Sequence, residues 1–177
     1  KADGSIDFTA IGSVDTQSGA STVTLTADAN ENSSGGITMA DGSFVDATLG
    51  LIDMDAWGNI VLSRVQTASD IAIDSHAGSI TDADSDQGFD LIATQALLHA
   101  ETGVGDQSNP MEVAVSALEV TATDGASTTF LQGNVYINDI DHASYDSGGL
   151  VLGGIDATLD AKTGLSAANT NGIQATG

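Results

Sequence analysis

Apolar residues recur along this chain at a fixed interval of 20 residues, and this spacing restricts the possible folds more than any other feature. One series contains six apolar positions: Leu51, Ile71, Leu91, Met111, Leu131 and Val151. A second series runs through Ile60, Ile80 and Val120, with Ala100 and Ile140 at the same interval. A unit of this length cannot bury an apolar face alone, so copies are expected to stack and share one core.

Short segments in which apolar and polar residues alternate predict strands rather than helices. The clearest are residues 5–8, 22–25, 37–39, 51–54, 59–62, 71–73, 118–120 and 134–137. Combined with the 20-residue interval, they predict an all-β fold, a right-handed parallel β-helix (β-solenoid) with turns of about 20 residues. Residues 1–177 would form a single segment, either a slice of a longer repetitive chain or a unit that stacks end to end into filaments.

The alternative is a β-sandwich of antiparallel strands, which also has short strands separated by turns. Such a fold is expected to contain hairpin turns centred between alternating runs, and only Asp41-Gly42 and Asp124-Gly125 resemble them. The 20-residue interval would be accidental in a sandwich, whereas a solenoid requires a repeat.

The charge balance excludes several classes of partner. Three Lys and Arg residues against 25 Asp and Glu residues give a net charge of −22, which repels nucleic acids and anionic lipids. A hydrophobic fraction of 41% is too high for a disordered acidic tail. No apolar run approaches the roughly 20 residues of a membrane span, so neither nucleic acid binding nor membrane insertion is expected.

Three segments carry a resemblance to a known family. They are residues 36–43 (GITMADGS), 52–62 (IDMDAWGNIVL) and 77–82 (AGSITD). These segments resemble the repeat region of giant filamentous-haemagglutinin-like bacterial surface proteins, and residues 103–106, 109–112 and 116–120 look like the second half of that repeat. The resemblance covers most of residues 36–138 and departs from the family at Trp57. It implies a right-handed parallel β-helix within a long, secreted or surface-tethered bacterial chain that has an adhesive or scaffold role.

One acidic run is a candidate metal site. Asp82, Asp84 and Asp86 alternate with other residues ahead of Gly88, and converging carboxylates suit Ca²⁺, which binds oxygen ligands. The run is not an EF-hand loop, because Gln87 and Ala93 occupy the positions of the loop glycine and the bidentate glutamate. The alternative interpretation is a solvated corner with no ion.

The remaining polar residues give weaker indications of chemistry. Three acid pairs have the composition of a glycosidase site, which needs two carboxylates around one bond: Asp53 with Asp55, Asp139 with Asp141, and Asp156 with Asp160. The three histidines are too far apart in sequence for a local metal motif and are interpreted as exposed strand residues: His76, His99 and His142.

The sequence therefore predicts a non-enzymatic structural segment of an extracellular or cell-surface bacterial adhesin or fibre. Its partners would be copies of itself, neighbouring repeats of the same chain, or a cell-surface or matrix ligand. The alternative is a β-helix enzyme that processes polysaccharides, a lyase or a glycoside hydrolase. That alternative is disfavoured because only 4% of the residues are aromatic, and the single internal Arg, Arg64, with one Lys near the end of the chain is poorly suited to bind acidic sugars.

Overall fold

The computed structural model of the protein describes residues 1–30, 32–84, 88–122, 134–140, 142, 150–152 and 173–174. In these ranges the chain forms β-strands and their connections, without a helix. The predicted all-β class is therefore confirmed. The described residues likewise include no helix with the length and apolarity of a membrane span.

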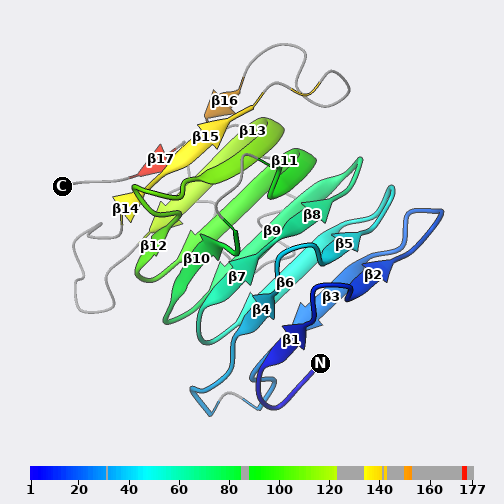
Figure 1. Ribbon diagram of the computed structural model, residues 1–177, viewed down its shortest axis with the longest axis vertical. Helices are drawn as coiled ribbons and strands as arrows, with labels where there is room; N and C mark the ends of the chain where they lie inside the picture. Colours follow the sequence, from blue (N-terminus) through cyan, green and yellow to red (C-terminus); the bar gives the residue numbers. More distant parts are fainter. Residues whose placement is uncertain are drawn as a thin grey trace.

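The chain passes alternately through two sheets, and one pass through both is called a circuit. The first sheet contains one short strand from each successive circuit (Figure 1). Its six strands pair in chain order: β1 (Ile6–Phe8), β4 (Ile37–Met39), β7 (Ile60–Leu62), β10 (Ser79–Asp82), β12 (Gly103–Val104) and β14 (Asn134–Val135). All five ladders are parallel. A parallel neighbour requires a crossover, and the crossover here is the passage through the second sheet.

The second sheet contains the rest of each circuit. In the early circuits it holds two short strands: β2 (Ser13–Asp15) and β3 (Val23–Thr26), β5 (Phe44–Asp46) and β6 (Ile52–Ala56), then β8 (Arg64–Gln66) and β9 (Asp70–Ser75). In the later circuits these are replaced by the long strands β11 (Leu91–Ala100) and β13 (Met111–Ala122). Three further strands pair with β13 in the same sheet: β15 (Ile137–Asp139), β16 (Val151–Leu152) and β17 (Ile173–Gln174).

The two short strands of a circuit merge into one long strand as the chain proceeds. The connection between them spans residues 16–22 in the first circuit, 47–51 in the second and 67–69 in the third. In the fourth circuit β11 has no such interruption, and it pairs with β8 through Leu91 and Ile92 and with β9 from Gln95 onward. The shape of the circuit therefore changes along the stack.

The core lies between the two sheets and is continuous along the stack. One buried cluster contains residues of both, among them Ile37 and Ile60 of the first sheet and Val45 and Ile52 of the second. Burial alternates along the strands, as in β4, β6 and β7, because successive side chains point to opposite faces. Parallel register places equivalent side chains in columns, such as Ile37, Ile60 and Ile80, all fully buried.

The interval between paired residues is not constant: Ile60 and Ile80 pair at the expected 20 residues, but a constant 20-residue turn along the whole stack is wrong. In the first sheet, successive partners lie 31, 23, 20, 24 and 31 residues apart: Ile6, Ile37, Ile60, Ile80, Val104 and Val135. In the second sheet Ile71 pairs with Ile52 rather than with Leu51, and Leu91 pairs with Val65 and Val113. The inward-facing side chains set the register, whereas the connections vary in length; Leu131 lies outside the described residues.

The antiparallel sandwich considered as the alternative is also wrong for the part of the chain that the structure describes. All fifteen strand pairings there are parallel. The sole antiparallel contact among those residues is an isolated bridge between Asp106 and Asn109, within a turn.

Candidate metal centre

The predicted acidic run is only partly brought together by the fold. Asp82 ends β10, and its Oδ1 accepts a hydrogen bond of 3.1 Å from the backbone N–H of Asp84. The backbone carbonyl of Asp84 accepts a hydrogen bond from the side-chain amide of Asn109. Asp86 lies outside the described residues. Of the run, only Asp82 belongs to the group of close carboxylates in the described structure.

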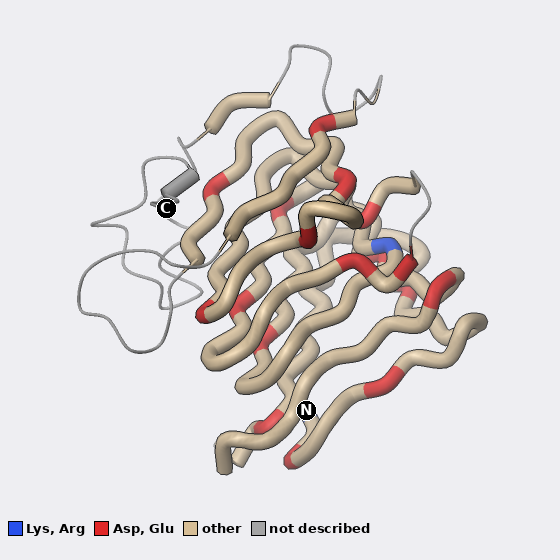
Figure 2. Tube along the Cα trace, turned by 60° about the vertical axis from the view of Figure 1, so that its left-hand side comes forward, with Lys and Arg blue, Asp and Glu red and all other residues tan. Residues whose placement is uncertain are grey.

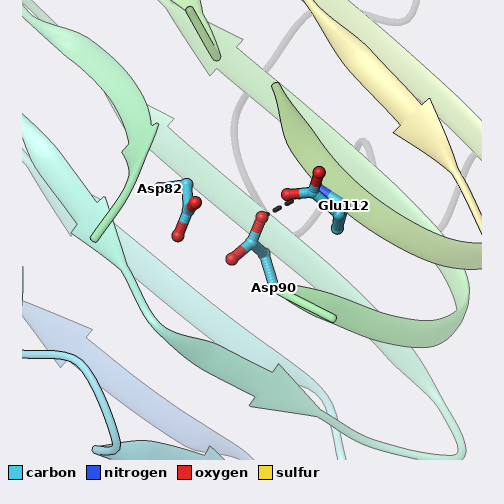
Figure 3. A group of neighbouring side chains, drawn as sticks. All are labelled: Asp82, Asp90 and Glu112. Atoms are coloured by element: carbon cyan, nitrogen blue, oxygen red, sulfur yellow. Dashed lines mark hydrogen bonds between the residues drawn. The ribbon is translucent and has the colours of Figure 1, made fainter. Parts of the chain in front are cut away.

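That group consists of Asp82, Asp90 and Glu112 (Figure 3). One carboxylate oxygen from each residue lies within 4.8 Å of the other two. Asp82 is on the first sheet, Asp90 directly precedes β11, and Glu112 is the second residue of β13. The three residues therefore come from two consecutive circuits of the chain, Asp82 and Asp90 from one and Glu112 from the next.

Strand register explains why Asp90 and Glu112 meet. Leu91 pairs with Val113, so the preceding residues of the two strands are neighbours. The backbone N–H of Asp90 donates to the carbonyl of Glu112 at 2.9 Å, and the backbone N–H of Glu112 donates to Asp90 Oδ2 at 2.7 Å. On the other side, Asn138 Nδ2 donates to Glu112 Oε1 at 3.4 Å. The sequence analysis missed both residues because they become neighbours only through this register.

Burial makes the group electrostatically unusual. Asp90 is 3% exposed and Glu112 is 1% exposed. Burial, together with the neighbouring acids Asp82 and Glu112, raises the pKa of Asp90 to about 9, against the opposing effect of the hydrogen bond from the Glu112 backbone. Burial also raises the pKa of Glu112, and the charge of Asp82 adds to the shift. Without a cation, the group therefore retains a proton at neutral pH.

No cationic side chain compensates these carboxylates in the described structure. By strand register Arg64 lies opposite Asp90, because Val65 pairs with Leu91 and Arg64 and Asp90 are the residues before them. Its guanidinium carbon lies instead 5.2 Å from the centre of the Phe44 ring, one circuit earlier. The ion pairs found among the described residues all involve histidine.

A second polar group lies on the outer face of the second sheet. Asp55, Asp74 and His99 are successive partners across β6, β9 and β11. His99 Nδ1 lies 2.7 Å from Asp74 Oδ1, and His76 Nε2 lies 3.4 Å from Asp55 Oδ1. The hydrogen bond to Asp74 raises the pKa of His99 despite the opposing effect of burial. Of the histidines expected to be exposed, His76 is exposed, whereas His99 is partly buried.

A groove of about 550 Å³ runs beside this polar group. Among its lining residues are Asp53, Asp55, Trp57 and His76. Trp57 stacks on His76 with ring centres 6.0 Å apart, so the residue that departs from the family pattern faces outward. Burial raises the pKa of Asp53, and the charges of Asp55 and Asp74 add to this.

The other residues considered from the sequence lie elsewhere. His142 contacts the Phe89 ring edge to face, with ring centres 5.4 Å apart. Asp139 ends β15. Its predicted partner Asp141, and the pair Asp156 and Asp160, lie outside the described residues.

Comparison with known proteins returns no relative. No protein-family model, no curated protein and no solved structure matches this chain.

Proposed function

We propose that this chain is a non-enzymatic structural segment, a right-handed parallel β-solenoid that forms a stiff rod within an extracellular bacterial adhesin or fibre. The observation that carries the proposal is the parallel, in-register stacking of successive circuits over one continuous core. In this arrangement the backbone hydrogen bonds run along the stacking axis, so bending or stretching the stack requires many of them to deform together.

The stack is also suited to extension by further units. The described strand β1 pairs on one side with β4, and the structure describes no strand on its other side. An open parallel edge presents backbone N–H and C=O groups to any strand of matching register. The partners of the proposed rod are therefore neighbouring repeats of a longer chain or further copies of this one.

The location and adhesive role rest on two sequence features. The first is the resemblance of residues 36–138 to bacterial surface repeats, and the second is the net charge of −22. Acidic residues are spread over many circuits of the stack (Figure 2). Such a surface favours solubility and contact with cations over contact with anionic surfaces.

Electron microscopy and fibre diffraction of the isolated protein test the proposal. Aligned, concentrated samples are expected to give a reflection near 4.8 Å along the stacking axis, the spacing between paired strands. Filaments that lengthen with rising concentration would identify end-to-end assembly, whereas separate short stacks would identify a spacer. Particles without this axial spacing would contradict the rod.

A polysaccharide-processing enzyme is the second candidate, and the groove beside Trp57 is the observation that favours it. An aromatic ring next to Asp53 and Asp55 has the composition of a sugar subsite. Against it, the Asp55 carboxylate is engaged with His76. Incubation with acidic and neutral polysaccharides is expected to release no products; products that disappear in Asp53→Asn would replace the structural proposal with the enzymatic one.

A further inference from the structure

We propose that Asp82, Asp90 and Glu112 form a binding site for a hard divalent cation, with calcium the best match, which links two consecutive circuits of the chain. This site differs from the run Asp82, Asp84 and Asp86 in two of its three residues. It is independent of the role proposed for the whole chain, because it depends only on local geometry.

The first argument is the geometry of the donor atoms. Two oxygens bound to one Ca²⁺ at 2.3–2.6 Å can be at most about 4.6–5.2 Å apart, and the three carboxylate oxygens here lie within 4.8 Å of one another. Mg²⁺ binds at about 2.0–2.1 Å, so its ligand oxygens must lie within about 4.2 Å, a tighter limit than the 4.8 Å that holds for this group. Figure 3 shows the three side chains facing a common space.

The second argument is independent of the clustering and concerns an unsatisfied acceptor. Asp82 Oδ2 is buried, and no backbone, amide or hydroxyl donor reaches it in the described structure, although Oδ1 of the same residue accepts from the Asp84 N–H. A buried oxygen without a donor is unfavourable, and more so when it is charged. A cation at the centre of the group would satisfy this oxygen directly.

The third argument is charge compensation. Glu112 and Asp90 are almost fully buried, and burying carboxylates without a partner is strongly unfavourable. The hydrogen bonds to them come from the Glu112 backbone N–H and the Asn138 side-chain amide, both weaker partners than a divalent ion. A bound Ca²⁺ would reduce the charge of the three ionised carboxylates from −3 to −1, and carbonyl oxygens or water would complete the coordination.

The position of the site gives the cation a structural effect. Asp82 belongs to the first sheet and the other two residues to the second, at the point where the chain passes between sheets. An ion bound to all three would fasten the end of β10 and the start of β11 to β13. Calcium is therefore expected to stabilise the fold rather than to act in catalysis.

Thermal unfolding with and without calcium tests the site. Wild-type protein in 150 mM NaCl is compared in EDTA, in 10 mM CaCl₂ and in 10 mM MgCl₂, and calcium binding is measured by isothermal titration calorimetry. A dissociation constant of about 0.1 mM, typical of extracellular calcium modules, predicts that calcium raises Tm by roughly 5–10 °C. Magnesium is expected to give a smaller rise.

Variants distinguish this site from general screening of an acidic surface. Asp82→Asn and Glu112→Gln keep the shape of the side chain and remove charge. Each is expected to have a Tm in EDTA equal to or above that of wild type, because buried repulsion is relieved, and to lose the calcium-dependent rise. Asp7→Asn, a change at an exposed acid on β1, is the matched control and is expected to keep the full rise.

Two results would overturn the proposal. One is the absence of saturable calcium binding to wild-type protein, which would identify the group as carboxyls that share a proton. The other is an equal calcium-dependent rise in wild type, Asp82→Asn and Glu112→Gln, which would assign the effect to surface screening. Neither result affects the axial spacing that tests the structural rod.

Discussion

At the residue scale, the hydrogen bond between His99 and Asp74 on the outer face of the second sheet is expected to make the stability of the fold depend on pH. The two side chains are 2.7 Å apart, and the bond raises the pKa of His99, with smaller contributions from the charges of Asp74 and Glu101. His76 Nε2 lies 3.9 Å from the second Asp74 oxygen, and Asp55 is the strand partner of Asp74. The folded state therefore binds a proton on His99 more tightly than the unfolded chain does.

This raised pKa predicts the direction of a pH effect on stability. The stabilising contribution is fully present below the unfolded-state pKa of about 6.5 and is lost as pH rises through the higher folded-state value. Wild-type protein is expected to lose stability as pH rises above about 6.5, and His99→Gln is expected to show a smaller decline, because the raised pKa of Asp90 still contributes in the variant. Chemical unfolding between pH 5 and 9 measures both, and superimposable profiles would show that the His99–Asp74 pair does not contribute.

Also at the residue scale, Gly78 occupies a place where the backbones of consecutive circuits come close. A Cβ at this position would lie 2.6 Å from the backbone nitrogen of Asn59 and 2.7 Å from the carbonyl carbon of Gly58. Gly78→Ala is expected to lower the free energy of unfolding by about 2–4 kcal/mol, because neither backbone atom can move independently of its strand.

Gly4 provides the control for this substitution, since a Cβ there would meet nothing within 4 Å. Gly4→Ala is expected to change the free energy of unfolding by less than about 1 kcal/mol. Urea unfolding of the two variants gives the comparison. Equal, small effects would mean that the backbones at Gly78 can separate without cost.

At the scale of the elements, stability is concentrated in columns of like side chains across the parallel strands. Ile60 lies between Ile37 and Ile80 in the first sheet, and all three are fully buried. Ile60→Ala is expected to cost about 3–4 kcal/mol of unfolding free energy, because the strands above and below restrict collapse around the cavity. Urea denaturation measures the loss.

Val61 is the matched control on the same strand. Its side chain points to the opposite face, between the partners Thr38 and Thr81, and is only partly buried. Val61→Ala is expected to cost less than about 1 kcal/mol. A similar cost for both variants would show that the two faces of β7 contribute equally, contrary to the burial pattern.

At the scale of the whole molecule, the net charge of −22 opposes compaction. The described residues place acids on successive strands, where parallel stacking brings like residues together, as in the pair Asp55 and Asp74. Monovalent salt screens this repulsion, because the Debye length falls from about 10 Å at 0.1 M to about 3 Å at 1 M. Raising NaCl from 0.1 to 1 M is expected to stabilise the fold by about 1 kcal/mol or more.

Thermal unfolding across this salt range measures the effect. Choline chloride is the control for specific ion effects and is expected to give a similar rise. A Tm that does not change with either salt would show that the acids are spaced too widely to repel one another.

Local pattern in the sequence was sufficient to determine the class of the fold. Alternating segments such as residues 37–39 and 59–62 form strands, because one apolar face must be buried at a period of two. The need for units to stack was also predictable, since no short strand can build a core alone. The parallel pairing confirms that part of the prediction.

Only the tertiary structure decided the register and the site that depends on it. The equal spacing of Leu51 and Ile71 suggested a pairing, but Ile52 is the true partner, because inward orientation sets the register and connection lengths vary freely. Asp90 and Glu112 are 22 residues apart in the chain and become neighbours only through the pairing of Leu91 with Val113. Composition predicted an acidic protein, while register determined which acids are buried together, because burial and proximity are properties of the assembled sheets.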